Sequence, residues 1–198
     1  IDAAARELGI AVTGGHTEVT SAVNHIVVVG DMHGIVEKDR LVTSSGARPG
    51  DLIIMTKTAG LEGTSILAAE KSAELRPHLA ESLRQEALRL LHNPGISVVK
   101  EALLAAAHGA TAMHDPTEGG IAMGLHELAT ASEVGMKLTI DAIPILPVTQ
   151  IICSVFGLNP LGLISSGALL LTIPPDRWPA LKKEMQSQEI KTHEIGVV

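Results

Sequence analysis

The segment Met113-His-Asp-Pro-Thr-Glu-Gly-Gly120 decides how the rest of this chain is interpreted, because it stands directly before a long apolar-periodic stretch. Asp115 is a residue type favoured as a helix N-cap, Pro116 suits the first helical position, and Glu118 completes a capping-box spacing. The segment therefore predicts the start of a helix that runs to about Ser132.

Capping does not explain the paired glycines Gly119 and Gly120. A glycine inside a helix costs about 1 kcal/mol relative to alanine, so two of them in a first turn indicate that something approaches closely. A phosphate group or a neighbouring backbone would serve equally well. With Asp115 and Thr117 beside them, these glycines form the strongest candidate site of the sequence.

Two further glycine-bearing turns have similar surroundings. Gly14-Gly15-His16-Thr17-Glu18 follows the apolar run 10–13, and Gly60-Leu-Glu-Gly63 lies between an apolar strand at 52–56 and a helix from Thr64. Backbone amides at such turns can bind an anion. A tight loop and a plain helix start are the alternatives, and the second turn lacks the lysine of a P-loop.

The remaining pattern alternates helices and strands at irregular spacing, which predicts an α+β fold with a mixed sheet packed against helices. A polar stretch places a domain boundary near residues 37–41. Residues 1–37 would end an α/β domain, and residues 38–198 would form a second, α+β domain. The predicted strands are 10–13, 25–30, 52–56, 137–140, 168–173 and from 192, and the other helices are 64–71, 77–91, 97–108, 148–156 and 177–187.

The amino-acid composition argues against nucleic acids and membranes as partners. Hydrophobic residues make up 45% of the 198 residues and the net charge is −7, which suits a globular protein without the basic surface that nucleic acids need. Aromatic platforms for stacking bases are nearly absent, with Trp178, Phe156 and no tyrosine. No apolar run is long enough to span a bilayer and no signal peptide is visible, so we expect no membrane partner and a cytoplasmic location.

Cysteine and histidine point to no further chemistry. Cys153 is the single cysteine, and its apolar neighbours predict a buried, inert thiol. None of the nine histidines has metal-ligand spacing, so no metal ligands are expected within this chain. The chain starts at Ile1 with a pattern typical of a helix tail that ends at Gly9, and it stops in a strand-like run. We therefore expect further sequence on both sides.

The three turns, in this order, resemble the aminoimidazole-ribonucleotide (AIR) synthetase superfamily, also called PurM-like. Gly14-Gly15-His16-Thr17 resembles the Gly-Gly-(His or Glu)-(Thr or Ser) segment of AIR and selenophosphate synthetases. Residues 49–54 with 60–63 resemble the start of the family's carboxy-terminal domain. Residues 113–120 are similar to the Asp-Pro-Thr-x-Gly-Gly motif of the hydrogenase-maturation carbamoyl dehydratases, the HypE family.

The resemblance implies an ATP-dependent enzyme that phosphorylates an amide or carbamoyl oxygen, in HypE as a step from carbamoyl to cyanide. It implies ATP and Mg²⁺ as cofactors, the latter held by an Asp-rich segment upstream of this chain. It also implies a homodimer and hydrogenase-maturation proteins as partners. The matching positions are Asp115 and His16 as catalytic residues, and Gly14, Gly15, Thr17, Gly60, Gly63, Thr117, Gly119 and Gly120 as nucleotide- or phosphate-binding residues.

Two departures keep other functions open. The HypE branch usually has Gly-Asp-Thr-Lys where this chain has Gly15-His16-Thr17-Glu18, which reverses the local charge. That branch also carries its carbamoyl group on a terminal cysteine, to which Cys153 does not correspond. The alternatives are a non-catalytic assembly partner, a sibling ATP-dependent synthetase or kinase, and a domain whose glycines only shape turns.

Overall fold

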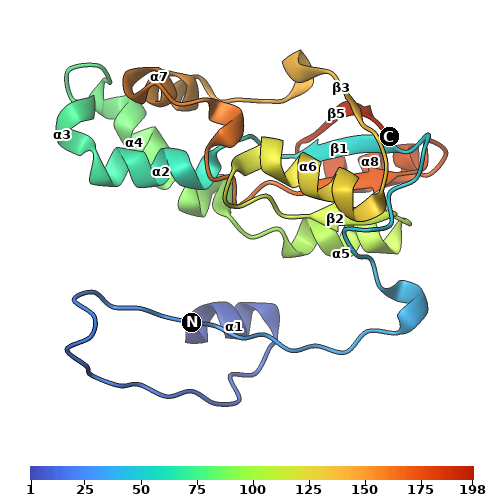
Figure 1. Ribbon diagram of the computed structural model, residues 1–198, viewed down its shortest axis with the longest axis horizontal. Helices are drawn as coiled ribbons and strands as arrows, with labels where there is room; N and C mark the ends of the chain where they lie inside the picture. The colour runs from blue at the N-terminus through green and yellow to red at the C-terminus, as the bar shows by residue number, and fades with distance from the viewer. The chain divides into compact units, whose positions relative to one another are not determined.

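The computed structural model describes all 198 residues and divides them into two compact units, residues 1–35 and 36–198. In the smaller unit, helix α1 (Asp2–Leu8) ends at Gly9, whose φ of 66° places it in the left-handed region that suits a helix C-cap. The sequence predicted this helix end. Residues 10–35 form no further helix or strand (Figure 1).

The strands predicted at 10–13 and 25–30 are therefore wrong for this structure. A strand needs a neighbouring strand to pair its amides and carbonyls, and residues 1–35 contain none. The β-branched side chains remain in solvent, with Ile26 95% and Val29 89% exposed. Their preference for strands depends on packing that this unit does not supply.

The larger unit is built on a five-stranded sheet in the order β2-β4-β1-β5-β3. Every pairing is antiparallel, so the α+β fold is confirmed while the sheet is antiparallel rather than mixed. Strands that run in the same direction, such as β1 and β2, are separated by an antiparallel strand. The bounds are β1 Leu52–Thr56, β2 Ala112–His114, β3 Lys137–Leu138, β4 Leu170–Ile173 and β5 Thr192–Val197.

Seven helices accompany the sheet. Most lie within a few residues of the predicted positions, but the helix predicted at 77–91 is shorter and follows a separate turn of helix. No helix has the length and apolar character needed to cross a membrane. The bounds are α2 Leu61–Glu70, α3 Ser72–Leu75, α4 Glu81–Arg89, α5 Val99–Ala107, α6 Gly120–Ser132, α7 Pro147–Phe156 and α8 Trp178–Ser187, with short turns η1 Lys38–Arg40, η2 Leu91–Gly95, η3 Ile140–Ala142 and η4 Pro160–Gly162.

Successive side chains of a strand point to opposite faces of the sheet, and here both faces are buried. Ile53 of β1 belongs to the core that includes Ile121 and Leu128 of α6. Its neighbour Ile54 belongs to the opposite core, with Leu181 of α8. Figure 1 shows the sheet with these helices around it. The two cores fix α6 and α8 on opposite faces.

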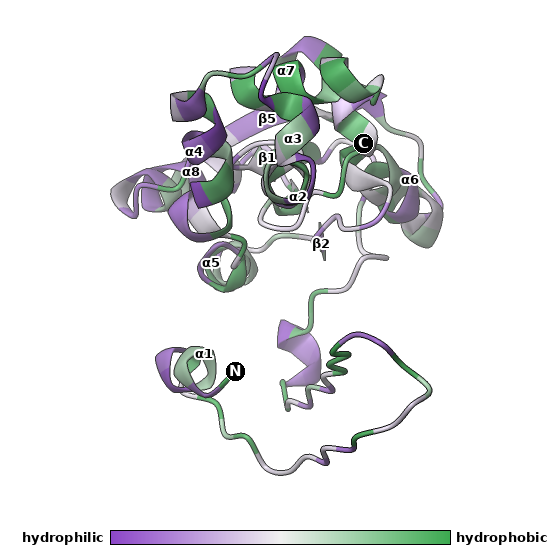
Figure 2. Ribbon diagram, turned by 90° about the vertical axis from the view of Figure 1, so that its left-hand side faces the viewer, coloured by the Kyte–Doolittle hydropathy of each residue, from purple (hydrophilic) through white to green (hydrophobic).

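A third apolar cluster lies away from the sheet and joins α2, α4 and α7. Ala68, Ala87 and Ile152 are buried within it, one from each of these helices. In Figure 2, α7 is coloured as a hydrophobic helix, in keeping with its sequence PVTQIICSVF. The cluster explains why α7 packs closely although it is short.

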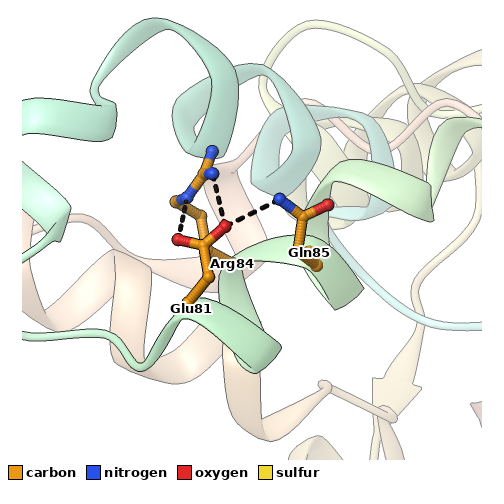
Figure 3. Close-up of polar contacts among 3 residues, drawn as sticks. All are labelled: Glu81, Arg84 and Gln85. Carbon is orange, nitrogen blue, oxygen red and sulfur yellow. Dashed lines mark hydrogen bonds and ion pairs between the residues drawn. The ribbon is translucent and has the colours of Figure 1, made fainter.

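On the outer side of α4, Glu81 accepts hydrogen bonds from Arg84 at 2.9 and 2.6 Å and from Gln85 at 2.7 Å (Figure 3). The donors stabilise the carboxylate form, so the hydrogen bonds from Arg84, followed by that from Gln85, lower the pKa of Glu81 to about 2. A carboxylate near the N-terminus of α4 also suits the helix dipole.

We expect Leu171→Ala to lower the free energy of unfolding by about 2–5 kcal/mol, because it opens a cavity in a close-packed core. Leu171 is fully buried in the centre of β4. Leu103→Ala is the matched control, since Leu103 is 67% exposed on α5, and it should change stability little. Urea denaturation of both variants measures the difference, and equal losses would contradict the described core.

The Glu81 contacts give a pH prediction. Because the pKa of Glu81 is lowered, its contacts stabilise the folded chain fully at pH values above the ordinary pKa of 4.5. This stabilisation is lost as the pH falls through about 2. Arg84→Gln removes the main donor, so the pKa of Glu81 should return toward 4.5. NMR titration of the side-chain carboxyl carbons measures it, and an unchanged pKa in the variant would refute the assignment.

Candidate functional site

Two of the three predicted glycine turns meet at one end of the sheet. Gly60, with φ 70°, precedes α2 after β1, and Gly119, with φ 74°, precedes α6 after β2. Strands β1 and β2 run in the same direction because each is antiparallel to β4. Both turns therefore lie at the same end of the sheet. The segment Asn159–Ser166, which precedes β4 in the chain, lies at this end too. We call this segment the central loop.

The central loop occupies the amides of the α2 turn. The Gly60 amide donates to the Ser165 hydroxyl oxygen at 2.9 Å, and the Gly63 amide donates to the Ile164 carbonyl at 3.0 Å. A Cβ atom at Gly63 would lie 2.5 Å from Cγ of Leu163. Packing thus accounts for these glycines, as the helix-start alternative proposed, and their role in phosphate binding stays a prediction.

Helix α6 starts at Gly120, with Gly119 as its N-cap and no side-chain cap. The prediction that Asp115 caps it, with Pro116 at its first position and Glu118 in a capping box, is wrong. Residues up to His114 pair with β4, and Pro116 is buried against α6, where a Cβ atom at Gly124 would lie 2.8 Å from its ring. The chain must therefore turn through 115–119 before the helix can begin.

The paired glycines have a structural cause. Gly120 has a φ of 61°, and a Cβ atom there would lie 2.4 Å from the Leu163 carbonyl oxygen and 2.6 Å from that of Leu161. A non-glycine residue is disfavoured by this backbone conformation and excluded by this proximity. The sequence left two explanations for Gly120, a bound phosphate group and a neighbouring backbone. The structure contains the close approach of a neighbouring backbone.

The 115–119 turn leaves Asp115 exposed, and its carboxylate makes no hydrogen bond or ion pair within the chain. The Thr117 hydroxyl lies 3.4 Å from the Asp115 carbonyl. Directly before this turn, Nε2 of His114 lies 2.6 Å from Oε2 of Glu127 on α6. This contact ties the end of β2 to the middle of α6 and so holds the Asp115 turn between two fixed points.

Sequence reasoning missed three polar residues at this end of the sheet. Ser165 is fully buried, and its hydroxyl donates to the Leu163 carbonyl at 2.7 Å while accepting from Gly60. Thr58 Oγ1 and Glu62 Oε2 are buried without a hydrogen-bond partner, which costs about 1–3 kcal/mol for each group. They flank Gly60, so a ligand donor or a water at this turn would satisfy them. In the sequence, Thr58 and Glu62 could have been recognised by their position within two residues of Gly60.

The half-buried lysine at this turn is already engaged. Lys57, with a φ of 53°, follows β1, and its Nζ lies 2.7 Å from Oε1 of the buried Glu101 and donates to the Ser97 carbonyl at 2.6 Å. Removing either partner would leave a buried charge uncompensated. The ammonium of Lys57 therefore holds α5 to the sheet and does not replace the missing P-loop lysine.

The remaining candidates belong to other parts of the chain. Gly14, Gly15, His16 and Thr17 are exposed in the smaller unit, and a Cβ atom at either glycine would meet nothing within 4 Å. Their joint action with Asp115 stays a prediction. Cys153 is buried as predicted, and burial raises the pKa of its thiol. The chain brings together no group of three or more side chains suited to hold a metal.

Comparison with known proteins identifies the larger unit. The family profile of the AIR synthase related protein, C-terminal domain, matches residues 48–198. The chain belongs to this AIR synthase related family. The match covers every strand of the sheet and both glycine turns that meet at the central loop.

Among individual relatives, this AIR synthase related chain is 33% identical over 169 residues to the carbamoyl dehydratase HypE of Cupriavidus necator, covering 84% of the chain and 45% of the relative. It is 32% identical over 190 residues to HypE of Azotobacter vinelandii, covering 93% of the chain and 52% of that protein. The chain thus spans about half the length of the curated relatives it matches.

Solved structures share the fold. HypE in complex with ATP matches with a TM-score of 0.60 at 25% identity, over 82% of this chain and 46% of that one. Thiamine-monophosphate kinase from Stenotrophomonas maltophilia matches with a TM-score of 0.65 at 22% identity, over 82% and 51%. A HypE–HypF complex matches with a TM-score of 0.57 at 23% identity, over 79% and 48%.

The close approach at the central loop makes a testable prediction. Gly120→Ala should lower the free energy of unfolding by about 1–3 kcal/mol through backbone strain alone, and by more because two carbonyls must move. Gly135→Ala is the control, since a Cβ atom there meets nothing within 4 Å. Urea denaturation compares them, and an unchanged stability of Gly120→Ala would show that the glycine is not required for packing.

Proposed function

We propose that the full protein is an ATP-dependent enzyme of the HypE type, which activates a carbamoyl oxygen by phosphorylation and so dehydrates the carbamoyl group to a nitrile. One observation in this chain carries the proposal. The carboxylate of Asp115 is exposed and unpaired within the chain, on a turn that is held by the His114–Glu127 contact. The identity of 33% to a carbamoyl dehydratase HypE supports the same reaction.

The turn suits proton transfer better than phosphate binding. Phosphorylation of the carbamoyl oxygen would release one nitrogen proton to solvent. The free carboxylate of Asp115 can accept the second as the C–O bond breaks and phosphate leaves, and a tethered turn keeps this carboxylate in place. ATP would supply the phosphoryl group that makes the carbamoyl oxygen a leaving group. The hydroxyl of the nearby Thr117 can donate a hydrogen bond to the substrate or to a phosphate oxygen.

The fit of a triphosphate to this chain is partial. The Gly60 and Gly63 amides already donate to Ser165 and Ile164, and Glu62 adds a negative charge beside them. The first-turn amides of α6 lack acceptors within their own helix, because helix geometry gives them none. We propose that α6 contributes to nucleotide binding, and that Gly14, Gly15, His16, Thr17 and the Mg²⁺ ligands belong to the rest of the nucleotide site.

A second candidate function rests on the charge reversal at residues 15–18. With His16 and Glu18 in place of the Asp and Lys of the HypE branch, the full protein would act as an assembly partner with weakened nucleotide binding. The HypE–HypF complex among the matching structures shows that HypE itself binds another protein. We also propose that the full protein forms a homodimer in the cytoplasm. A kinase reaction on the same fold is a further alternative.

Calorimetric titration of the full protein with Mg·ATP, together with an assay of ADP release in the presence of a carbamoyl donor, separates these functions. The enzyme proposal expects binding and turnover. Binding of a HypF-type partner without Mg·ATP binding would favour the assembly partner and would sink the enzyme proposal.

The role of Asp115 is tested by Asp115→Asn, which keeps the size of the side chain and removes its charge. Loss of a proton acceptor should lower kcat by about a hundredfold or more with little change in Mg·ATP affinity. Asp141→Asn, at another exposed carboxylate in η3, is the control and should leave kcat unchanged. If both variants keep full activity, Asp115 is not catalytic.

A further inference from the structure

A pocket of about 350 Å³ lies at the other end of the sheet from the central loop. Its walls come from the chain around residues 39–48, the turn at 109–111 between α5 and β2, and Pro174 and Arg177 between β4 and α8. Strands β1 and β2 begin at this end and β4 ends here, whereas β1 and β2 end at the central loop. The pocket is therefore distinct from the Asp115 turn.

Three arginines line this pocket, Arg40, Arg48 and Arg177, which we call the arginine pocket. The guanidinium groups of Arg40 and Arg48 make no ion pair or hydrogen bond within the chain. Nε of Arg177 lies 4.0 Å from Asp176, and both side chains are exposed. Two of the three guanidinium groups in the pocket, those of Arg40 and Arg48, thus have no ion-pair partner, in a protein whose net charge is −7.

Few negative groups oppose these arginines. Asp39 is the acidic residue that lines the pocket, and Asp176 is the ion-pair partner of Arg177. Asp51 lies nearby but is buried, and its Oδ2 accepts from the Arg48 amide at 3.0 Å and from the Thr111 hydroxyl at 2.6 Å. Arg48 and Thr111 both line the pocket, so these hydrogen bonds hold the carboxylate of Asp51 against its wall. Among the residues that line the pocket, three arginines accompany a single carboxylate, that of Asp39.

Helix α8 adds to this charge. It begins at Trp178 with Arg177 as its N-cap and no side-chain cap, so the positive end of a ten-residue helix lies at the pocket. The first amides of α8 are not free donors, because the Trp178 amide donates to the Pro174 carbonyl at 3.2 Å and Pro179 has no N–H. The guanidinium groups are suited to phosphate oxygens. The wall also contains Leu41, Val42 and Pro174, which offer an apolar surface to the rest of a ligand.

We propose that the arginine pocket binds a compact phosphate ester, with the phosphate on Arg40, Arg48 and Arg177 and an aliphatic or sugar moiety against the apolar wall. The volume lies within the range of about 300–1,000 Å³ typical of small-molecule sites. The pocket contains no aromatic side chain on which a base could stack, which favours a phosphate ester without a nucleobase. The proposal does not depend on the reaction at Asp115.

Trp178 provides a local signal for the test. It is the single tryptophan of the chain, follows Arg177 directly and is 6% exposed. Its fluorescence therefore reports on the start of α8. The 198-residue chain is titrated with glycerol 3-phosphate and, separately, with inorganic phosphate, by calorimetry and by Trp178 fluorescence. Low ionic strength is needed because the arginines are exposed.

We expect saturable binding that changes the Trp178 fluorescence, with glycerol 3-phosphate binding more tightly than inorganic phosphate. Arg48→Gln and Arg177→Gln should each weaken binding about tenfold, through loss of a charge-assisted hydrogen bond. Arg89→Gln is the control, because Arg89 is exposed on α4 without an ion pair, and it should bind as the parent does.

Circular dichroism verifies that each variant is folded. Absence of saturable binding overturns the proposal, and so does equal weakening by Arg89→Gln. Binding of inorganic phosphate alone refutes the ester, and unchanged affinity in both Arg48→Gln and Arg177→Gln refutes the location. None of these outcomes bears on Mg·ATP binding by the full protein.

Discussion

The central loop is held between the starts of two helices, and this contact constrains the whole larger unit. The backbone at Leu161 and Leu163 approaches Gly120 so closely that a Cβ atom would lie 2.6 and 2.4 Å from their carbonyl oxygens. The side chain of Leu163 fills the space that a Cβ atom would need at Gly63. Because α2 and α6 belong to different cores, their shared contact with one loop joins the helical cluster to the sheet.

The same contact determines what the candidate site can do. Amides that looked available for phosphate at Gly60 and Gly63 are satisfied by Ser165 and Ile164. The polar groups that remain are the free carboxylate of Asp115, the buried atoms of Thr58 and Glu62, and the first-turn amides of α6.

Charge is distributed unevenly between the two ends of the sheet. Asp115, Glu62 and Glu127 lie at the end where β1 and β2 finish. The arginine pocket lies at the end where these strands begin. The separation arises because an extended strand places its two flanking turns at opposite ends of the sheet, and β1 and β2 run in the same direction. One domain thus carries these carboxylates at one end of its sheet and three arginines at the other.

The sequence by itself determined the family, the α+β class and most elements of residues 48–198. Strand β1, helix α7 and the helix end at Gly9 follow from local apolar pattern and glycine chemistry, which act over a few residues. Only the tertiary structure decided that residues 25–30 form no strand here, because a strand depends on a partner. It also decided that α6 starts at Gly120 and that Gly120 faces Leu163 rather than open space, because contacts between residues more than 40 positions apart leave no periodic signal in the chain.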